Sequence, residues 1–418
     1  MKKMIKSIAL CTSLLATLSA CSPEKTKEVT KVQLSVNEQM QSDELTAAGE
    51  QLIAPHTFHL ADRAFALALE KNPSDKKAEF YRVFLKRFMV FRGVMTNIKP
   101  MVKKYGDAAK YDKEMKKIPN SPINDFLFMP ADGVIKPINT EEDVQNLLIA
   151  YRNALQDFRT YVAMNQDLKL ELHVNPIIFM NQINENMTSN CTVVPGTKEE
   201  DGQIECDTSE IATVRVNIAD LLSLKQEAAG EILYLALYTS YNFNGLAQYT
   251  KDNSGKEMTA KESYDLLQSK VDFKLLKNEG FTAIRSLGAD LGVAAKWAMK
   301  YQDSICPKDK NGMPVARKGY MFKKGLCIDN ASNLEKNLAL LEQVLKGTMA
   351  VKIGSDEANQ ITKNINFLAP FDKPVADLRM LTPATWNEAG TQGTSFKDKT
   401  LGGMFPDQDA DFLLQQTK

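Results

Sequence analysis

The first 21 residues constrain this chain more than any other segment. The cations Lys2, Lys3 and Lys6 precede an apolar run from Ile8 to Leu18, which gives way to small residues and then to Cys21. The run is too short to cross a bilayer, because a spanning helix needs about 20 apolar residues. A basic start, a short apolar stretch and small residues at its end are typical of an export signal. We therefore expect the chain to fold outside the cytoplasm, where cysteines can pair.

The segment Leu18-Ser19-Ala20-Cys21 resembles the signal of bacterial lipoproteins. The resemblance implies that residues 1–20 are a signal peptide and that Cys21 becomes the acylated N-terminus, held at the membrane by lipid. Ser22 follows where Asp favours inner-membrane retention in enteric bacteria, so the resemblance implies an outer-membrane anchor facing the periplasm. Inner-membrane or surface anchoring stays open, as do an ordinary secretory signal and an uncleaved N-terminal anchor.

Composition sets broad limits on the fold and the partners. With 418 residues, 44% of them hydrophobic and 25% charged, the chain is long enough for one large or two modest globular domains. Lys plus Arg and Asp plus Glu both number 52, so the formal net charge is zero. No field of a single sign exists to attract an anionic polymer, which argues against nucleic-acid binding.

Four of the six cysteines remain after the signal and the lipid site are set aside. An even number in an exported chain predicts disulfides. Each neighbouring pair brackets a polar, turn-rich stretch, so we expect the pairs Cys191–Cys206 and Cys306–Cys327 among the three possible pairings. A zinc site is the competing interpretation, but the spacings lack the close CxxC pairs that such sites use.

The N-terminal part of the mature chain divides into a tether and a helical unit. Residues 21–41 are polar and charged without an apolar period, which predicts a flexible tether. Residues 42–105 begin with one 34-residue unit, from Ser42 to Asp75, that resembles a tetratricopeptide repeat (TPR). Small residues at Gly49 and Ala61 would let its two helices approach closely. The resemblance rests on these matches: Leu45, Ala48, Gly49, Leu52, Ala61, Phe65, Ala68, Leu69 and Pro73.

A helix over residues 76–98 is expected to cover the apolar face of this unit. Its aromatic residues recur at spacings of three and four, which predicts a wide apolar stripe. Such a stripe usually packs in a core, and less often lines a binding groove. If the TPR-like groove binds a protein partner, we expect Phe58, Phe65 and Phe84 to contact it.

The remainder, residues 106–418, is predicted to be a mainly helical body with a coil-rich C-terminus. Residues 107–139 look mostly irregular, and Thr140-Glu141-Glu142-Asp143 resembles a capping box that opens a helix toward Asn165. Further helices are expected from Asp220, as its cap, to about Tyr241, over residues 281–298 and over residues 334–349. Alternating apolar residues at 168–174 and 214–218 predict a small antiparallel sheet. The large apolar side chains from Leu401 onward should dock the tail against the helices.

The fold class expected is therefore mainly α, with TPR-like hairpins, a small antiparallel β element and two disulfide-closed loops. Two further segments, Val216 to Leu222 and Thr400 to Pro406, resemble a loosely defined group of exported bacterial helical proteins over roughly the outer thirds of the chain. No activity is assigned to that group, so this resemblance implies architecture alone.

Every chemical motif in the chain is weak. His56 and His59 are spaced for a shared metal, but Pro55 places His56 in a turn. Asp407, Asp409 and Asp411 start like a calcium loop that lacks its glycine and its final glutamate. Hydrolase, metalloprotease, phosphate-binding and dinucleotide motifs are absent from the sequence. We therefore expect no catalytic site, no metal and no cofactor.

Two functions follow from these observations. The first is a lipid-anchored scaffold or adaptor that binds a protein partner in the bacterial envelope, with the membrane reached through the N-terminal lipid. The alternative is a small-molecule or substrate-binding component of a transporter, whose cavity would be lined by the helix carrying Tyr234, Tyr238 and Tyr241.

Overall fold

The computed structural model describes residues 35–415 of the chain with several gaps. The gaps are residues 54–56, 116–125, 131–132, 166–167, 175–190, 194–203, 207–211, 277–280, 282–283, 307, 311, 313–320, 322–330 and 354–359. The described part is mainly helical, with small two-stranded antiparallel sheets, as the sequence predicted. None of its helices is long and apolar enough to cross a membrane.

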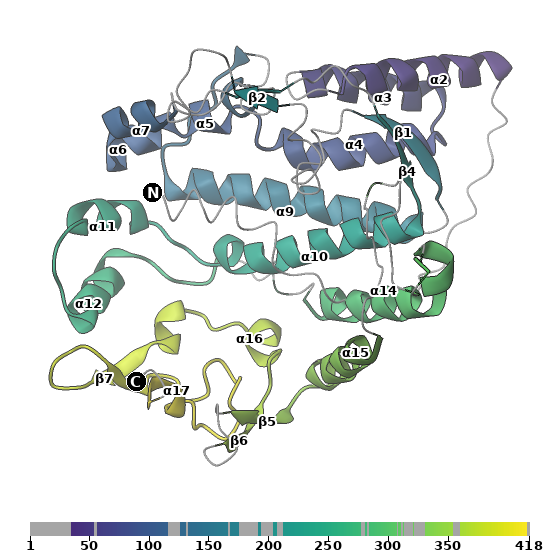
Figure 1. Ribbon diagram of the computed structural model, residues 1–418. Helices are drawn as coiled ribbons and strands as arrows, with labels where there is room; N and C mark the ends of the chain where they lie inside the picture. Colours follow the sequence, from purple (N-terminus) through teal and green to yellow (C-terminus); the bar gives the residue numbers. More distant parts are fainter. Residues whose placement is uncertain are drawn as a thin grey trace.

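The main helices form a series in which each contacts the next along the chain. Figure 1 shows them stacked from the N-terminal helices, drawn in purple, to the green helices of the C-terminal half. Because neighbours in space are near neighbours in sequence, each helix covers the apolar face of the one before. The series is α2 (Val36–Gln51), α3 (Phe58–Lys71), α4 (Lys76–Met89), α9 (Glu141–Met164), α10 (Ile218–Ser240), α14 (Ile284–Ile305) and α15 (Ala331–Lys346).

The first helix begins earlier than the sequence suggested. A capping box starts α2, in which the Ser35 hydroxyl accepts from the Glu38 amide at 3.2 Å and the Glu38 carboxylate accepts from the Ser35 amide at 3.0 Å. Two backbone donors at the helix start are thereby satisfied. The expected tether over residues 21–41 is therefore wrong from Val36 onward, although residues 36–40 are exposed.

Close packing joins the first three helices. A Cβ placed on Gly49 of α2 would lie 2.5 Å from the Phe65 ring of α3, so only glycine fits there without movement. Phe65 in turn stacks on Tyr81 of α4, with ring centroids 4.6 Å apart. Asp75 caps α4 and also accepts hydrogen bonds from the hydroxyls of Ser42 and Thr46 on α2, at 2.9 and 2.8 Å.

One hydrophobic core runs through this stack from Ile53 to Leu368. Within this core, aromatic rings of α4 and α9 meet edge to face. The ring centroid of Phe158 lies 6.3 Å from that of Phe80 and 6.0 Å from that of Phe84. The N-terminal helices and the later body therefore share buried side chains.

The helix expected over residues 76–98 is shorter than predicted. It ends at Met89, and Gly93 then adopts a left-handed conformation with φ of 70°. A Cβ at Gly93 would lie 2.5 Å from the Pro130 backbone, so a later segment packs against this turn. Three short helices follow. α5 (Val94–Asn97) and α6 (Lys99–Tyr105) precede residues 107–139, the stretch that we expected to be irregular, and α7 (Ala108–Met115) lies within it.

The central helices α9 and α10 agree closely with the sequence prediction. Thr140 and Asp143 form the predicted capping box of α9. The cap of α10 is Asn217 rather than Asp220, which is the third residue of the helix and completes a second capping box. The predicted sheet is also present, since β1 (Leu170–Val174) pairs antiparallel with β4 (Ala212–Val216).

Two helices and a second small sheet complete the middle of the chain. α11 (Leu246–Asn253) and α12 (Ala260–Lys270) lie to one side of the stack in Figure 1. β2 (Cys191–Val193) pairs antiparallel with β3 (Ile204–Cys206).

The C-terminal segment, yellow in Figure 1, contains more regular structure than the coil we expected. It forms two hairpins and three short helical turns. A separate core cluster buries Phe405 and Ala410 against Ile365, so the predicted docking of the tail occurs, but mainly against strands. The elements are β5 (Met349–Ile353), β6 (Ile361–Ile365), α16 (Ala369–Asp372), η6 (Leu378–Leu381), β7 (Pro383–Trp386), β8 (Gly393–Phe396) and α17 (Phe412–Gln415).

Candidate functional site

One face of the central helix α10 carries two carboxylates and two tyrosines in a row. Glu227, Glu231, Tyr234 and Tyr238 are separated by four, three and four residues, which places them on one side of a helix with 3.6 residues per turn. The opposite sides of α10 are occupied by small and aliphatic residues that are buried in the core. We call this row the α10 stripe.

The tyrosine end of the α10 stripe is open to solvent. Tyr234 is 44% exposed, Tyr238 is 40% exposed, and Leu237 beside them is 41% exposed. The two tyrosine rings lie 5.5 Å apart, and Tyr238 lies 6.0 Å from Phe243, which follows the helix. Large apolar groups grouped in this way on a surface are typical of an interaction site.

The carboxylate end of the α10 stripe is more enclosed. The Tyr151 hydroxyl of α9 donates a hydrogen bond to the Glu231 carboxylate. Burial raises the pKa of Glu231 to about 6, and Glu227 adds to the increase, whereas Arg87 of α4 lowers it. Burial and the charge of Glu231 likewise raise the pKa of Tyr151. The carboxyl of Glu231 therefore loses its proton at a higher pH than an ordinary glutamate.

Arg87 supplies the positive charge near Glu231 while sitting among aromatic rings. Its guanidinium lies 4.6 Å from the ring centroids of both Phe84 and Phe158 and 5.4 Å from that of Phe88. Arg87 is only 6% exposed, and its buried Nε has no hydrogen-bond partner within the described part of the chain. The cation is therefore stabilised chiefly by the π faces and by the nearby carboxylate.

These groups are suited to non-covalent recognition. Half-exposed tyrosines offer large rigid contact area together with a hydroxyl. Within the ranges that the structure describes, no three or more His, Cys, Asp or Glu side chains are grouped so as to hold a metal ion. The α10 stripe is therefore a candidate surface for binding a partner.

The predicted binding residues are not at this surface. Phe58, Phe65 and Phe84 are 3%, 0% and 3% exposed and all belong to the main core. Buried rings cannot contact a partner at the surface of the folded chain, so this prediction is wrong as a binding set. The aromatic stripe has the packing role that such stripes usually have.

The alternative prediction of a tyrosine-lined cavity is also revised. Tyr234 and Tyr238 lie on the surface, whereas Tyr241 is 2% exposed and its hydroxyl donates to the Val375 carbonyl at 2.8 Å. A hollow of about 310 Å³ lies elsewhere, between α11 and α12. It is lined by Gly245, Gln248, Tyr249, Asp252, Asn253, Lys256, Leu266 and Lys270.

Several sequence-predicted sites lie partly or wholly outside the described residues. This applies to the lipidation site Cys21, to Cys327 and to His56, while His59 lies in α3. Cys191 and Cys206 are directly opposite each other in the β2–β3 pair. Cys306, directly after α14 (Ile284–Ile305), is buried.

The three aspartates of the calcium-like segment have partners within the protein. Asp407 accepts from the Asn364 side chain at 2.9 Å, and Asp409 forms an ion pair with Lys363. Asp411 accepts from the Phe396 amide and the Ser395 hydroxyl at 2.8 and 2.9 Å. These contacts attach the tail to strands β6 and β8.

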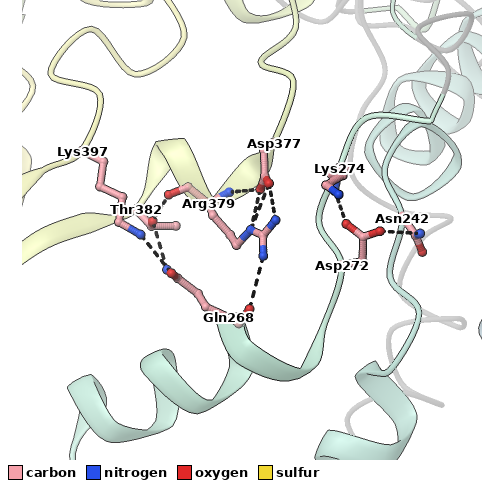
Figure 2. Close-up of polar contacts among 8 residues, drawn as sticks. All are labelled: Asn242, Gln268, Asp272, Lys274, Asp377, Arg379, Thr382 and Lys397. Carbon is pink, nitrogen blue, oxygen red and sulfur yellow. Dashed lines mark hydrogen bonds and ion pairs between the residues drawn. The ribbon is translucent and has the colours of Figure 1, made fainter.

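Polar contacts also join α12 to the C-terminal segment (Figure 2). The Gln268 side chain donates to the Thr382 hydroxyl at 3.4 Å and accepts from Lys397 Nζ at 2.9 Å. Arg379 donates to the Gln268 carbonyl at 3.4 Å and pairs with Asp377 through both carboxylate oxygens. Because each group has a partner inside the fold, this cluster has a structural role.

No known protein family, no curated protein and no solved structure matches this chain.

Sequence reasoning identified the tyrosines of α10 but missed the other half of the site. The spacing of Glu227 and Glu231 relative to the tyrosines was visible in the sequence. No local pattern links Arg87 or Tyr151 to Glu231, because they are 144 and 80 residues away in the chain, so only the packing of α4, α9 and α10 brings them together.

Proposed function

We propose that this protein is a lipid-anchored adaptor of the bacterial envelope that binds a protein partner through the exposed tyrosine end of the α10 stripe. The observation that carries the proposal is the grouping of Tyr234, Leu237 and Tyr238 at the surface of a helix that is otherwise buried. Tyrosines supply much of the binding energy at protein interfaces because they combine apolar area with a polar tip. The long stack of helices provides a rigid support for them.

The finer features of the architecture belong to the same proposal. We infer that α2 and α3 form a TPR-like hairpin, which is supported by the close approach of Gly49 to Phe65. We also infer a Cys191–Cys206 disulfide. Opposed residues of an antiparallel pair have Cα atoms about 4.5–5.5 Å apart, which is within the range that a disulfide bridges. Peptide mapping without reductant tests this pair and the pair Cys306–Cys327.

The anchor and the location rest on the N-terminal sequence. Acylation of Cys21 would hold the protein at the outer membrane, facing the periplasm, with the folded body beginning about 14 residues later at Ser35. Labelling cells with a palmitate analogue should modify the wild-type protein. Label that persists in Cys21→Ala, or no label at all, would contradict this part of the proposal.

Site-specific photocrosslinking tests the binding surface. Benzoylphenylalanine placed at Tyr238 should yield a crosslinked partner in intact cells, and the same group at Leu340 of α15 is the control. Leu340 is 51% exposed and lies on a different helix, so it samples the surface in general. Equal crosslinking at both positions, or none at Tyr238, would contradict a partner on the α10 stripe.

A small-molecule function remains the second candidate because of the hollow between α11 and α12. Its volume of about 310 Å³ lies at the lower end of the range of ligand pockets. A ligand that fills it should raise the apparent Tm of the wild-type protein and should lose this effect in Gln248→Ala. A screen of envelope metabolites without any shift would remove this candidate.

A further inference from the structure

Glu50 of α2 receives hydrogen bonds from two other elements. Its side chain is 5% exposed, and its carboxylate accepts from the Tyr81 hydroxyl of α4 at 2.6 Å and lies 2.6 Å from Lys77 Nζ of the same helix. From β1, which contacts α2 (Figure 1), the backbone amide of His173 donates to Oε1 at 2.9 Å, and His173 Nδ1 lies 3.0 Å from Oε2. A buried carboxylate with these contacts is fixed in place, and it holds the imidazole ring in one orientation.

About half of the His173 side chain, 48%, is accessible to solvent. Because Nδ1 faces a carboxylate, Nδ1 carries the proton, and Nε2 of the neutral ring is a proton acceptor. Nε2 has no hydrogen-bond partner within the part of the chain that the structure describes. An imidazole held in this way is the commonest general base in proteins, because imidazole exchanges its proton near neutral pH.

A hydroxyl group lies on the strand beside His173. Thr213 of β4 is directly opposite His173 in the antiparallel β1–β4 pair, so the two side chains lie on the same face. The amide of His173 points away from β4, toward Glu50, which marks this as a non-hydrogen-bonded pair. The Cα atoms of such pairs are only about 4.5 Å apart, closer than in hydrogen-bonded pairs. The exposed Thr213 side chain is therefore a close neighbour of the ring.

These three groups follow one another across β1. Glu50 lies at the free edge of the strand and Thr213 on the opposite side, with the imidazole between them. The two nitrogens of an imidazole point in nearly opposite directions, so a ring whose Nδ1 faces Glu50 turns Nε2 away from it, toward the side of Thr213. A carboxylate, an imidazole and a hydroxyl in this order activate the hydroxyl as a nucleophile. The last two are not hydrogen-bonded to each other here, and such contacts often tighten when a substrate binds.

A cation is present on the same face. Arg215 follows Thr213 by two residues, so its side chain lies on the same side of β4. Its Nε donates to Glu171 at 3.2 Å, but the two side chains are 59% and 63% exposed, so this ion pair is weak. The guanidinium is therefore able to approach the negative oxygen that forms when a carbonyl group is attacked.

We propose that Glu50, His173 and Thr213 form an acyl-transfer site that hydrolyses carboxylic esters. His173 Nε2 takes the hydroxyl proton of Thr213 while Oγ1 bonds to the carbonyl carbon of the ester. The bond to the leaving oxygen then breaks, and this oxygen takes the proton from Nε2, which leaves the acyl group on Thr213. Water, activated by Nε2 in the same way, releases the carboxylic acid and restores the hydroxyl.

Glu50 is a positioning residue in this site, because it acts through the ring of His173 and does not touch the substrate. The site shares no residue with the α10 stripe. It goes beyond the proposed adaptor function and departs from the expectation that the chain has no catalytic site.

The experiment uses the activated ester p-nitrophenyl acetate and the purified protein. The release of p-nitrophenolate is followed by absorbance between about pH 5 and pH 9, and mass spectrometry of peptides locates the acetyl group. The variants are Thr213→Val, His173→Gln and Glu50→Gln. The matched control is Thr362→Val, because Thr362 is also an exposed threonine in a two-stranded antiparallel pair, β5–β6. Circular dichroism confirms that each variant is folded.

The expected result is an acetyl group on Thr213 in the wild type and in Thr362→Val. Thr213→Val and His173→Gln should lower the rate by about 100-fold or more, and the wild-type rate should rise with pH as one group loses its proton. Glu50→Gln should lower the rate about tenfold or more and move the midpoint of this rise to lower pH, because the imidazolium loses its counter-charge.

A purely structural role of Glu50 would leave that midpoint unchanged and would contradict its positioning role. Acetyl groups found only on lysines or on His173, or a Thr213→Val variant that reacts at the rate of Thr362→Val, would overturn the whole inference. Because Thr213 is exposed and valine has its shape, this second comparison does not depend on the stability of the Glu50 variant.

Discussion

Arg159 of α9 donates a hydrogen bond to Asp290 of α14 at 2.5 Å, and both side chains are only 5% exposed. Lys225 of α10 lies 3.1 Å from the other oxygen of the same carboxylate. One buried aspartate therefore contacts cations from two helices and joins three neighbours in the stack. These contacts fix the position of α10 relative to α9 and α14, and α10 carries the candidate binding surface.

Removing this carboxylate should be costly. Asp290→Ala would leave Arg159 and Lys225 buried without their counter-charge, so we expect a loss of about 3–5 kcal/mol in the free energy of unfolding. The matched control is Asp157→Ala, which breaks a half-exposed ion pair with Lys86 and should cost no more than about 1 kcal/mol. Urea denaturation followed by circular dichroism measures both. Similar midpoints for the two variants would show that the buried cluster does not stabilise the stack.

The pH dependence of stability should reveal Glu231. Its pKa is raised in the folded protein from 4.5 to about 6, so folding favours the protonated form. The stabilising contribution of that form is complete below about pH 4.5 and is lost as the pH rises through about 6. Glu231→Gln keeps an acceptor for Tyr151 and should be ~2 kcal/mol more stable than the wild type at pH 7, with the difference vanishing near pH 4.

Glu342, whose pKa shifts downward rather than upward, provides the control for the Glu231 prediction. The contact with Lys296 at 2.6 Å lowers the pKa of Glu342, so Glu342→Gln should not stabilise the protein at pH 7. Unfolding midpoints between pH 4 and pH 8 compare the two variants. If Glu231→Gln and Glu342→Gln respond to pH alike, the environment assigned to Glu231 is incorrect.

Close helix packing at Gly49 gives a third prediction. The new methyl group in Gly49→Ala would meet the fully buried Phe65 ring, which is itself held against Tyr81, so we expect a loss of about 1–3 kcal/mol. Gly292 in α14 is the control, because a Cβ there would lie 3.6 Å from Leu341, an ordinary contact. Gly292→Ala should be neutral or stabilise by up to ~1 kcal/mol. A Gly49→Ala variant as stable as Gly292→Ala would contradict the tight contact.

The C-terminal tail should contribute to stability. Phe405→Ala removes a ring that is 2% exposed and packs against Phe412, so a loss of about 3–5 kcal/mol is expected. Truncation after Lys399 should lower the Tm and expose the remaining chain to protease, whereas Met380→Ala, at a position 47% exposed, should change little. A truncated protein that melts and resists protease like the intact one would show that the tail does not support the fold.

Local patterns in the sequence predicted much of the helical fold. The boundaries of α9 and α10 followed from apolar spacing and from capping residues at Thr140 and near Asn217, which act within one turn. The β1–β4 pair followed from alternation of buried and exposed residues, confirmed by Leu172 and Val216 at 0% and 1% exposure. Helix boundaries and strand pairs that depend on patterns of neighbouring residues could therefore be predicted from the sequence.

Features that depend on distant contacts could not be predicted in this way. The helix α4 ends at Met89, and the turn that follows it packs at Gly93 against Pro130, which lies 37 residues later. Phe58, Phe65 and Phe84 were predicted to line a groove, but contacts with distant residues bury all three. Phe58 packs on Phe126, Phe65 on Tyr81 and Phe84 on Phe158. The environment of Glu231 could not be predicted either, because it is formed by Arg87 of α4 and Tyr151 of α9, which are distant in the chain.

The central claim, a partner bound over Tyr238 outside the cytoplasm, is tested most directly by cysteine accessibility. Tyr238→Cys and the control Leu340→Cys are labelled with a membrane-impermeant maleimide, in cells with a permeabilised outer membrane and as purified proteins. We predict that Leu340→Cys reacts at the same rate in both states, whereas Tyr238→Cys reacts several-fold more slowly in the envelope because the partner covers it. Equal rates for Tyr238→Cys in both states would contradict the account.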